Sequence, residues 1–151
     1  MARIVVGIDG SDRAAQALRW SLAEARLRDA DLDVVHAISE PIPFADPVIF
    51  PPVPIGDLKA EGLKVIDQAL AGLERGEVRI ERIAAVGGAA RILCEAAEGA
   101  DLLVVSSRGL GGFRGLLVGS VTQQVVAHAP CPVVVVVPQD RKVDTRASTR
   151  P

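Results

Sequence analysis

Short runs of apolar, β-branched residues alternate along the chain with segments of helical periodicity. Runs that are almost continuously Val and Ile, rather than strictly alternating, are typical of strands covered on both faces. Residues 78–86 alternate more than the other runs, so we expect them to form an exposed or edge strand. The five predicted strands are Ile4–Ile8, Leu32–Ile38, Val78–Val86, Leu102–Val105 and Val133–Val137.

Between these runs, apolar residues recur every three to four positions, which predicts amphipathic helices. Ser11 or Asp12 can cap the first helix, because a side-chain oxygen there satisfies an amide without a partner inside the helix. Pro130 and Pro132 predict where the last helix ends. The four predicted helices are Asp12–Arg28, Leu58–Leu73, Ala89–Ala97 and Ser120–His128.

Strands and helices therefore alternate from the first strand to the fifth. Such alternation requires right-handed crossovers and produces a mostly parallel sheet with helices on both faces. We predict an α/β domain with a doubly wound, five-stranded parallel sheet in the order 3-2-1-4-5, a Rossmann-like fold. Ligands of such folds bind at the carboxyl ends of the strands.

Two segments fall outside this alternation. Residues 41–54 hold six of the ten prolines and predict a long loop after the second strand, near the expected ligand crevice. Whether residues 39–56 close over a ligand as a lid stays open. Residues 139–151 are polar and charged, which predicts a flexible tail behind a domain of residues 1–138.

Composition and charge exclude several classes of protein. A chain of 151 residues with 49% hydrophobic and 24% charged residues fits one globular domain. The net charge of −2 argues against a general nucleic-acid binder, which usually carries a basic excess. No apolar run reaches the roughly 18 residues of a membrane helix, and the first residues lack a signal-peptide layout. We therefore expect a cytoplasmic protein without a membrane partner.

The two cysteines, Cys94 and Cys131, lie far apart in apolar surroundings, with no Cys-x-x-Cys and no histidine pair at metal spacing. This pattern predicts free, buried thiols in a reducing compartment, rather than a disulfide or a zinc site.

The densest chemical signal is the segment Ser106–Ser120, between the fourth strand and the last helix. It contains five of the fourteen glycines, and glycine lets the backbone approach a ligand closely. A helix N-terminus adds free amides and a positive dipole end, so the segment suits phosphate. Ser120 adds a hydroxyl, and Arg108 or Arg114 could add a cation. The alternative is a flexible loop before a capped helix.

This loop differs from the commoner phosphate motifs. It has no Gly-Lys-Ser/Thr, so it is not a Walker-type P-loop. Arg114 stands where a dinucleotide fingerprint has its third glycine, and the second strand carries His36-Ala37 rather than an acidic residue for a ribose hydroxyl. A nicotinamide or flavin dinucleotide site is therefore disfavoured.

The loop resembles that of the ATP-binding branch of the universal stress protein superfamily, which has the form Gly-x2-Gly-x9-Gly-Ser/Thr. Gly109 and Gly119-Ser120 match its second and third parts, whereas Ser106 stands in place of its first glycine. Residues 7–11 (Gly-Ile-Asp-Gly-Ser) and 129–136 (Ala-Pro-Cys-Pro-Val-Val-Val-Val) are also similar to family segments. The resemblance extends from about Ile4 to Val137.

The resemblance implies that ATP is the ligand and that Mg²⁺ or Mn²⁺ can accompany its phosphates. It implies that Asp9 contacts the ribose or the adenine side of ATP and that Gly7 lies beside Asp9. It also implies that the backbone of Ala37 forms hydrogen bonds with adenine. The loop wraps the ribose and phosphates, and the helix start holds the phosphates. The implied residues are Gly7, Asp9, Ala37, Ser106, Ser107, Arg108, Gly109, Leu110, Gly111, Gly112, Gly119, Ser120 and Val121.

Ser106 leaves two alternatives open. If the position requires a positive φ, serine is strained there and affinity falls. If glycine serves only close approach, a small serine is tolerated. Among the other polar residues, we expect His36 to be packed and hydrogen-bonded rather than a catalytic base, and Trp20 to be partly buried rather than stacked on a ligand.

Three functions remain open. An ATP-binding regulatory module in the stress response is favoured. Hydrolysis needs a base, metal ligands and charge stabilisation, yet the loop has no lysine and Asp9 is the evident carboxylate, so at most slow turnover is expected. The third is a dimeric, partner-binding protein whose pocket is vestigial or takes cyclic AMP. The resemblance implies a homodimer through Val133–Val137, an apolar strand at a sheet edge of the kind that pairs with another chain.

Overall fold

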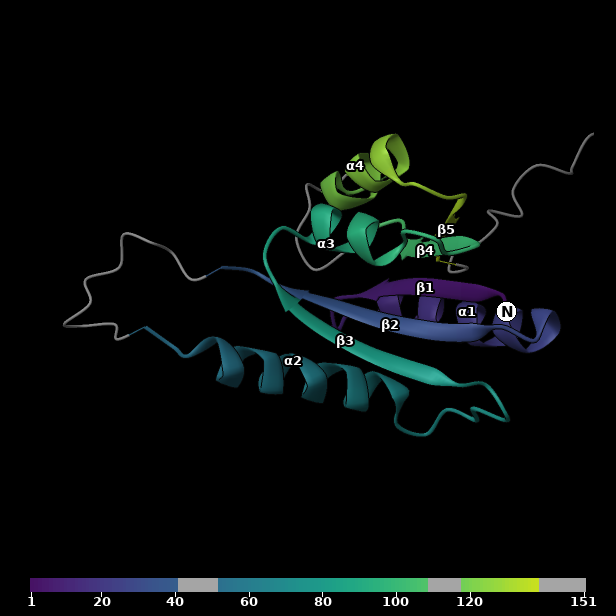
Figure 1. Ribbon diagram of the computed structural model, residues 1–151, viewed down its shortest axis with the longest axis horizontal. Helices are drawn as coiled ribbons and strands as arrows, with labels where there is room; N and C mark the ends of the chain where they lie inside the picture. Colours follow the sequence, from purple (N-terminus) through teal and green to yellow (C-terminus); the bar gives the residue numbers. More distant parts are fainter. Residues whose placement is uncertain (41–51, 109–117, 139–151) are drawn as a thin grey trace, which may run out of the picture.

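The computed structural model describes residues 1–40, 52–108 and 118–138. Most of the predicted loop 39–56, the centre of the glycine-rich segment and the predicted tail lie outside these ranges. Five strands and four helices alternate along the described chain (Figure 1). They are β1 (Arg3–Ile8), α1 (Asp12–Arg28), β2 (Asp31–Ile38), α2 (Ile55–Leu70), β3 (Ile80–Val86), α3 (Ala89–Ala96), β4 (Leu102–Ser106), α4 (Ser120–His128) and β5 (Val133–Val136).

The five strands form one parallel sheet in the order β3-β2-β1-β4-β5, which confirms the predicted doubly wound topology. Helices α1 and α2 cover one face, and α3 and α4 cover the other (Figure 1). β3 is an edge strand and only partly buried, as its more alternating sequence predicts.

The sheet separates two apolar clusters. Alternate residues of a strand point to opposite faces, so Ile4 and Val6 of β1 pack under α1 and α2, while Val5 packs under α3 and α4. All five residues of β4 are buried. The near-continuous Val and Ile runs therefore reflect strands that are covered on both sides.

The largest difference from the predicted boundaries concerns α2. The helix runs from Ile55 to Leu70 instead of Leu58 to Leu73, whereas the other ends agree within two residues. Pro54 is the N-cap of α2, a place where the missing amide of proline costs nothing. Gly72 follows with a φ of +74° and turns the chain, so Leu73 packs against the core from outside the helix.

Candidate functional site

The carboxyl ends of β1 and β4 lie side by side at the centre of the sheet. These strands pair from Ile4 with Leu102 to Val6 with Val104. The chain leaves β1 into α1 on one face and leaves β4 towards α4 on the other (Figure 1). In doubly wound folds such a reversal of winding is where the ligand-binding crevice forms, at the carboxyl ends of the strands. Continuing the register places Asp9 level with Ser107.

The turn after β1 is held by two side chains. Asp9 Oδ1 accepts a hydrogen bond from the Ser11 amide at 3.0 Å. Ser11 Oγ accepts from the Ala14 amide at 3.2 Å, so Ser11 rather than Asp12 is the N-cap of α1. Gly10 between them has a φ of +84°, which glycine adopts without strain. Asp9 therefore organises the turn and fixes its own carboxylate at the crevice.

The start of α4 is attached to the end of β4 by two hydrogen bonds. The Gly119 amide donates to the Ser107 carbonyl at 2.7 Å. The hydroxyl of Thr122 donates to the Ser106 carbonyl at 2.8 Å and is buried. Sequence reasoning missed Thr122, because a hydroxyl in the first turn of a helix gives no sign of a partner 16 positions earlier. The bonds bring the first turn of α4 to the crevice.

That first turn has the features of an anion site. Gly119 is the N-cap and supplies no side-chain oxygen. The first amides of a helix have no acceptor within it and lie at the positive end of its dipole. Ser120 is exposed and Val121 is 38% exposed, so the side chains of this turn lie at the surface.

Ser106 is unstrained where the resembling family has glycine. Among the described non-glycine residues only Asp29 has a positive φ, so the alternative in which this position requires a left-handed backbone is wrong here. Ser106 is 8% exposed and its hydroxyl donates to the Arg108 carbonyl at 2.9 Å. The serine therefore holds the first residues of the loop instead of distorting them.

Gly7 and Ala37 lie at the same edge with different surroundings. A Cβ on Gly7 would stand 2.8 Å from a methyl carbon of Leu93, so glycine lets α3 pack closely on β1. The Asp31 amide donates to the Ala2 carbonyl, just before β1. Successive residues of a strand direct their backbone groups to alternate sides, so the backbone groups of Ala37, six residues on, also face β1. Pairing of β1 with β2 ends at Ile8 and His36, which leaves the Ala37 carbonyl beyond the end of β1.

His36 and Trp20 have the structural surroundings that the sequence predicts. His36 Nδ1 lies 2.9 Å from the Ile8 carbonyl, so Nδ1 carries the proton in this contact and the prediction of a hydrogen-bonded histidine is confirmed. Trp20 is 37% exposed, in agreement with partial burial. Arg108 is half-buried at the end of the described loop segment.

The predicted loop residues Gly109, Leu110, Gly111 and Gly112 lie outside the described residues, so their contacts remain predictions. Within residues 1–40, 52–108 and 118–138, His, Cys, Asp and Glu side chains form no group of three that could hold a metal ion. Over the same ranges, no helix has the length and apolar character needed to cross a membrane.

The two cysteines are free, as predicted, but half-buried rather than fully enclosed. Burial raises the pKa of the Cys94 thiol above its ordinary value. Burial also raises the pKa of Cys131; the nearby Arg3 opposes this shift, whereas Cys94 and Asp101 add to it. Both side chains therefore favour the protonated thiol, which is a poor nucleophile.

We expect both thiols to react more slowly with iodoacetamide in the folded protein than in the urea-unfolded protein near pH 8. Folding raises the pKa of both thiols, so the folded state favours their protonated form. Their contribution to the free energy of unfolding is therefore complete below the ordinary thiol pKa of about 8.5, and it is lost as the pH rises through the pKa values of the folded protein. Mass spectrometry of Cys94→Ser and Cys131→Ser across pH measures each remaining thiol. Equal rates in the folded and unfolded states would contradict this prediction.

A family profile and individual relatives of this chain all point to the same protein family. The profile of the universal stress protein family matches residues 1–137. A universal stress protein of Thermus aquaticus is 38% identical over 137 residues, covering 88% of this chain and 96% of that protein. A universal stress protein of Mycobacterium tuberculosis is 34% identical over 142 residues, covering 91% of this chain. The chain spans 48% of that relative, about half its length.

A solved structure adds a ligand to this comparison. A universal stress protein in complex with cyclic AMP superposes with a TM-score of 0.61 and 31% identity, covering 90% of this chain and 96% of that one.

Proposed function

The chain belongs to the universal stress protein family, and from this we propose that it binds ATP in the crevice between β1 and β4 and acts as a nucleotide-dependent regulatory module of the stress response. The observation that carries the proposal is the attachment of α4 to β4, through the Gly119 amide and the Thr122 hydroxyl. This attachment presents the amides of the first helical turn to the crevice, where they favour phosphate.

The nucleotide would span the crevice. The Ala37 carbonyl beyond the end of β1 suits the exocyclic amine of adenine, and the Asp9 carboxylate suits a ribose hydroxyl. The phosphates would lie between Ser107, Arg108 and Ser120, with the glycines of 109–112 close to them and Mg²⁺ or Mn²⁺ as counterion. Among the described residues, this arrangement places no carboxylate beside the phosphates to activate water, so hydrolysis would be slow at most.

We expect freshly purified protein to release close to one equivalent of ATP per chain when it is denatured. Asp9→Ala should weaken binding of added ATP by roughly tenfold, because a hydrogen bond from a ligand hydroxyl to a charged group contributes about 1.5 kcal/mol or more. Chromatography of the released nucleotide and isothermal titration measure the two effects. Asp57→Ala, which removes an exposed carboxylate from α2, is the matched control.

A protein that releases no nucleotide and also fails to bind ATP at millimolar concentration would refute the proposal. Release of ADP or AMP would instead require a test of hydrolysis. One observation favours a second candidate: the relative solved with cyclic AMP is 31% identical to this chain. If cyclic AMP is the released nucleotide, the pocket serves as a sensor or store of that ligand.

We also propose that two copies associate through β5 and that the protein works in the cytoplasm. β5 is at the sheet edge, and each of its four valines is only partly buried. Val137 beside it is 61% exposed. An apolar edge strand with unpaired backbone groups pairs readily with a second copy, which gives a symmetric dimer.

A further inference from the structure

A groove lies away from the strand ends proposed to bind the nucleotide. It has a volume of about 210 Å³ and lies between the second half of α1 and the turn after α2. α1 runs from the carboxyl end of β1 to the amino end of β2, so its last turns lie at the opposite edge of the sheet, on the side where the chain begins (Figure 1). The groove is lined by Arg19, Leu22, Ala23, Arg26, Leu73 and Glu74.

The groove has an apolar floor and a basic wall. Leu22 is 4% exposed and Leu73 packs against the core, so the floor is fixed. Arg19 and Arg26 are exposed on one side of α1, two helical turns and roughly 10 Å apart. Ala23 between them is small, so another backbone can approach α1 closely.

The charged side chains of the groove form no ion pair with one another or with other described residues. No described ion pair or side-chain hydrogen bond involves Arg19, Arg26 or Glu74. Arg28 nearby is instead paired with Glu24 at 2.6 Å. Two guanidinium groups facing one carboxylate leave the groove with a local positive excess, although the whole chain has a net charge of −2.

We propose that this groove binds an amphipathic helix of a partner protein that carries two carboxylates seven residues apart with leucine-like side chains between them. Carboxylates at that spacing lie on one helix face at the same separation as Arg19 and Arg26. Arginine pairs with carboxylates through two parallel hydrogen bonds. The cavity admits aliphatic side chains but not a whole helix, so the partner lies across its mouth and inserts them, a known mode of recognition.

Glu74 determines how a bound partner helix is oriented in the groove. It lies in the turn after α2, so the partner meets a basic wall on α1 and a carboxylate on the opposite side. A partner helix therefore places its acidic face towards α1. The proposal concerns the amino edge of the sheet, so it does not depend on nucleotide binding at the carboxyl edge.

The test uses a fluorescent synthetic peptide of about 18 residues, long enough for partial helicity in isolation, with two glutamates seven residues apart and two leucines between them. We expect the full chain to bind it, with and without ATP. Arg26→Glu should weaken binding by at least about tenfold, as reversal of an interfacial charge does. Lys59→Glu, with the same charge change at an exposed site on α2, should leave binding unchanged.

Two further measurements test whether binding depends on the charges of the groove. A peptide with lysine at both glutamate positions should bind Arg19→Glu/Arg26→Glu and not the unaltered protein, while Glu74→Lys should tighten binding of the original peptide. Fluorescence anisotropy measures each affinity. Absence of binding, equal binding by Arg26→Glu, or equal binding of a scrambled peptide of the same charge would overturn the proposal. Failure of ATP binding would leave it intact.

Discussion

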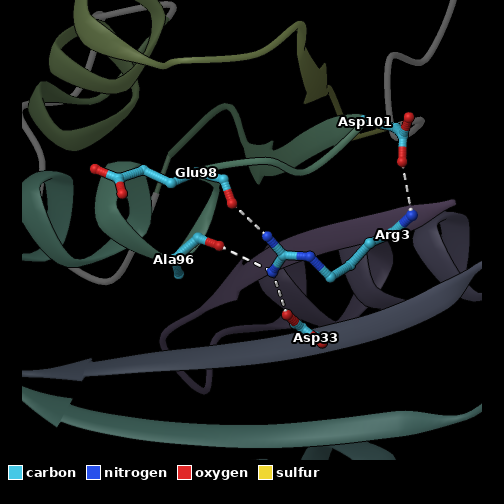
Figure 2. A network of polar contacts seen from close by, with 5 residues as sticks. All are labelled: Arg3, Asp33, Ala96, Glu98 and Asp101. Atoms are coloured by element: carbon cyan, nitrogen blue, oxygen red, sulfur yellow. Dashed lines mark hydrogen bonds and ion pairs between the residues drawn. The ribbon is translucent and has the colours of Figure 1, made fainter. Parts of the chain in front are cut away.

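Replacing Arg3 with methionine is expected to lower the free energy of unfolding by about 3 kcal/mol, because it leaves a largely buried carboxylate without its cation. The Arg3 guanidinium donates to Asp33 Oδ2 at 2.6 Å and to the carbonyls of Ala96 and Glu98 at 3.1 and 2.5 Å (Figure 2). The Asp33 side chain is only 11% exposed. Urea unfolding followed by circular dichroism measures the loss.

The contacts of Arg3 explain the size of this effect. They join the start of β1 to β2 and to the end of α3 (Figure 2). The Arg3 amide also donates to Asp101 Oδ2 at 2.8 Å, a bond that the substitution keeps. Methionine preserves the unbranched stem, so the loss reports the guanidinium contacts rather than a cavity.

Two control variants separate this account from a general effect of lost charge. Arg3→Met/Asp33→Val removes both partners and should be more stable than Arg3→Met alone. Arg82→Met breaks a pair with Asp67 whose side chains are 46% and 53% exposed, and it should cost no more than about 0.5 kcal/mol. Similar losses for Arg3→Met and Arg82→Met would show that Asp33 tolerates the absence of its partner.

The fold could be predicted from the sequence because its signals are local. A run of Val and Ile or a three-to-four periodicity is complete within one segment, so the strands and three of the helices are found within two residues of their predicted ends. α2 is the exception. The apolar periodicity of this segment continues to Leu73. The helix nevertheless begins after Pro54 and ends before Gly72, because the backbone angles of these two residues set its ends, and a pattern of apolar positions carries no information about them.

The contacts that join distant segments could not be predicted in this way. Arg3 bonds to residues 30 to 98 positions away, and nothing in its neighbourhood distinguishes it from a solvated arginine. The sequence resemblance places Gly7 beside a ligand, yet the absence of a Cβ at this position makes room for Leu93 on α3. Both depend on how helices lie on the sheet, which is known only once the topology is assembled.

Part of the geometry around the candidate site follows from the sequence. The strand ends that carry Asp9 and Ser106 meet as parallel topology requires, and the glycine-rich pattern indicates the start of α4. The role of Thr122 emerges only from its hydroxyl contact with the Ser106 carbonyl. The suitability of serine at position 106 likewise depends on a backbone angle and a hydroxyl partner that no motif contains.

Replacing Ser120 with aspartate is expected to weaken ATP binding by roughly 100-fold while the protein stays folded. Ser120 is the first residue of α4 and is exposed. A carboxylate there interacts favourably with the helix dipole, by about 0.3–1 kcal/mol, so thermal stability should be kept or slightly raised. The same charge occupies the place proposed for the phosphates and repels them, so binding and stability should change in opposite directions.

Isothermal titration with ATP and thermal unfolding without nucleotide measure the two effects. Gly56→Asp adds the same charge to the first turn of α2, where a Cβ meets no atom within 4 Å. It should leave ATP affinity unchanged, which separates a local effect at α4 from a change in net charge. If Ser120→Asp bound ATP as tightly as the unaltered chain, the phosphates would lie away from α4, and the attachment of α4 to β4 would serve folding alone.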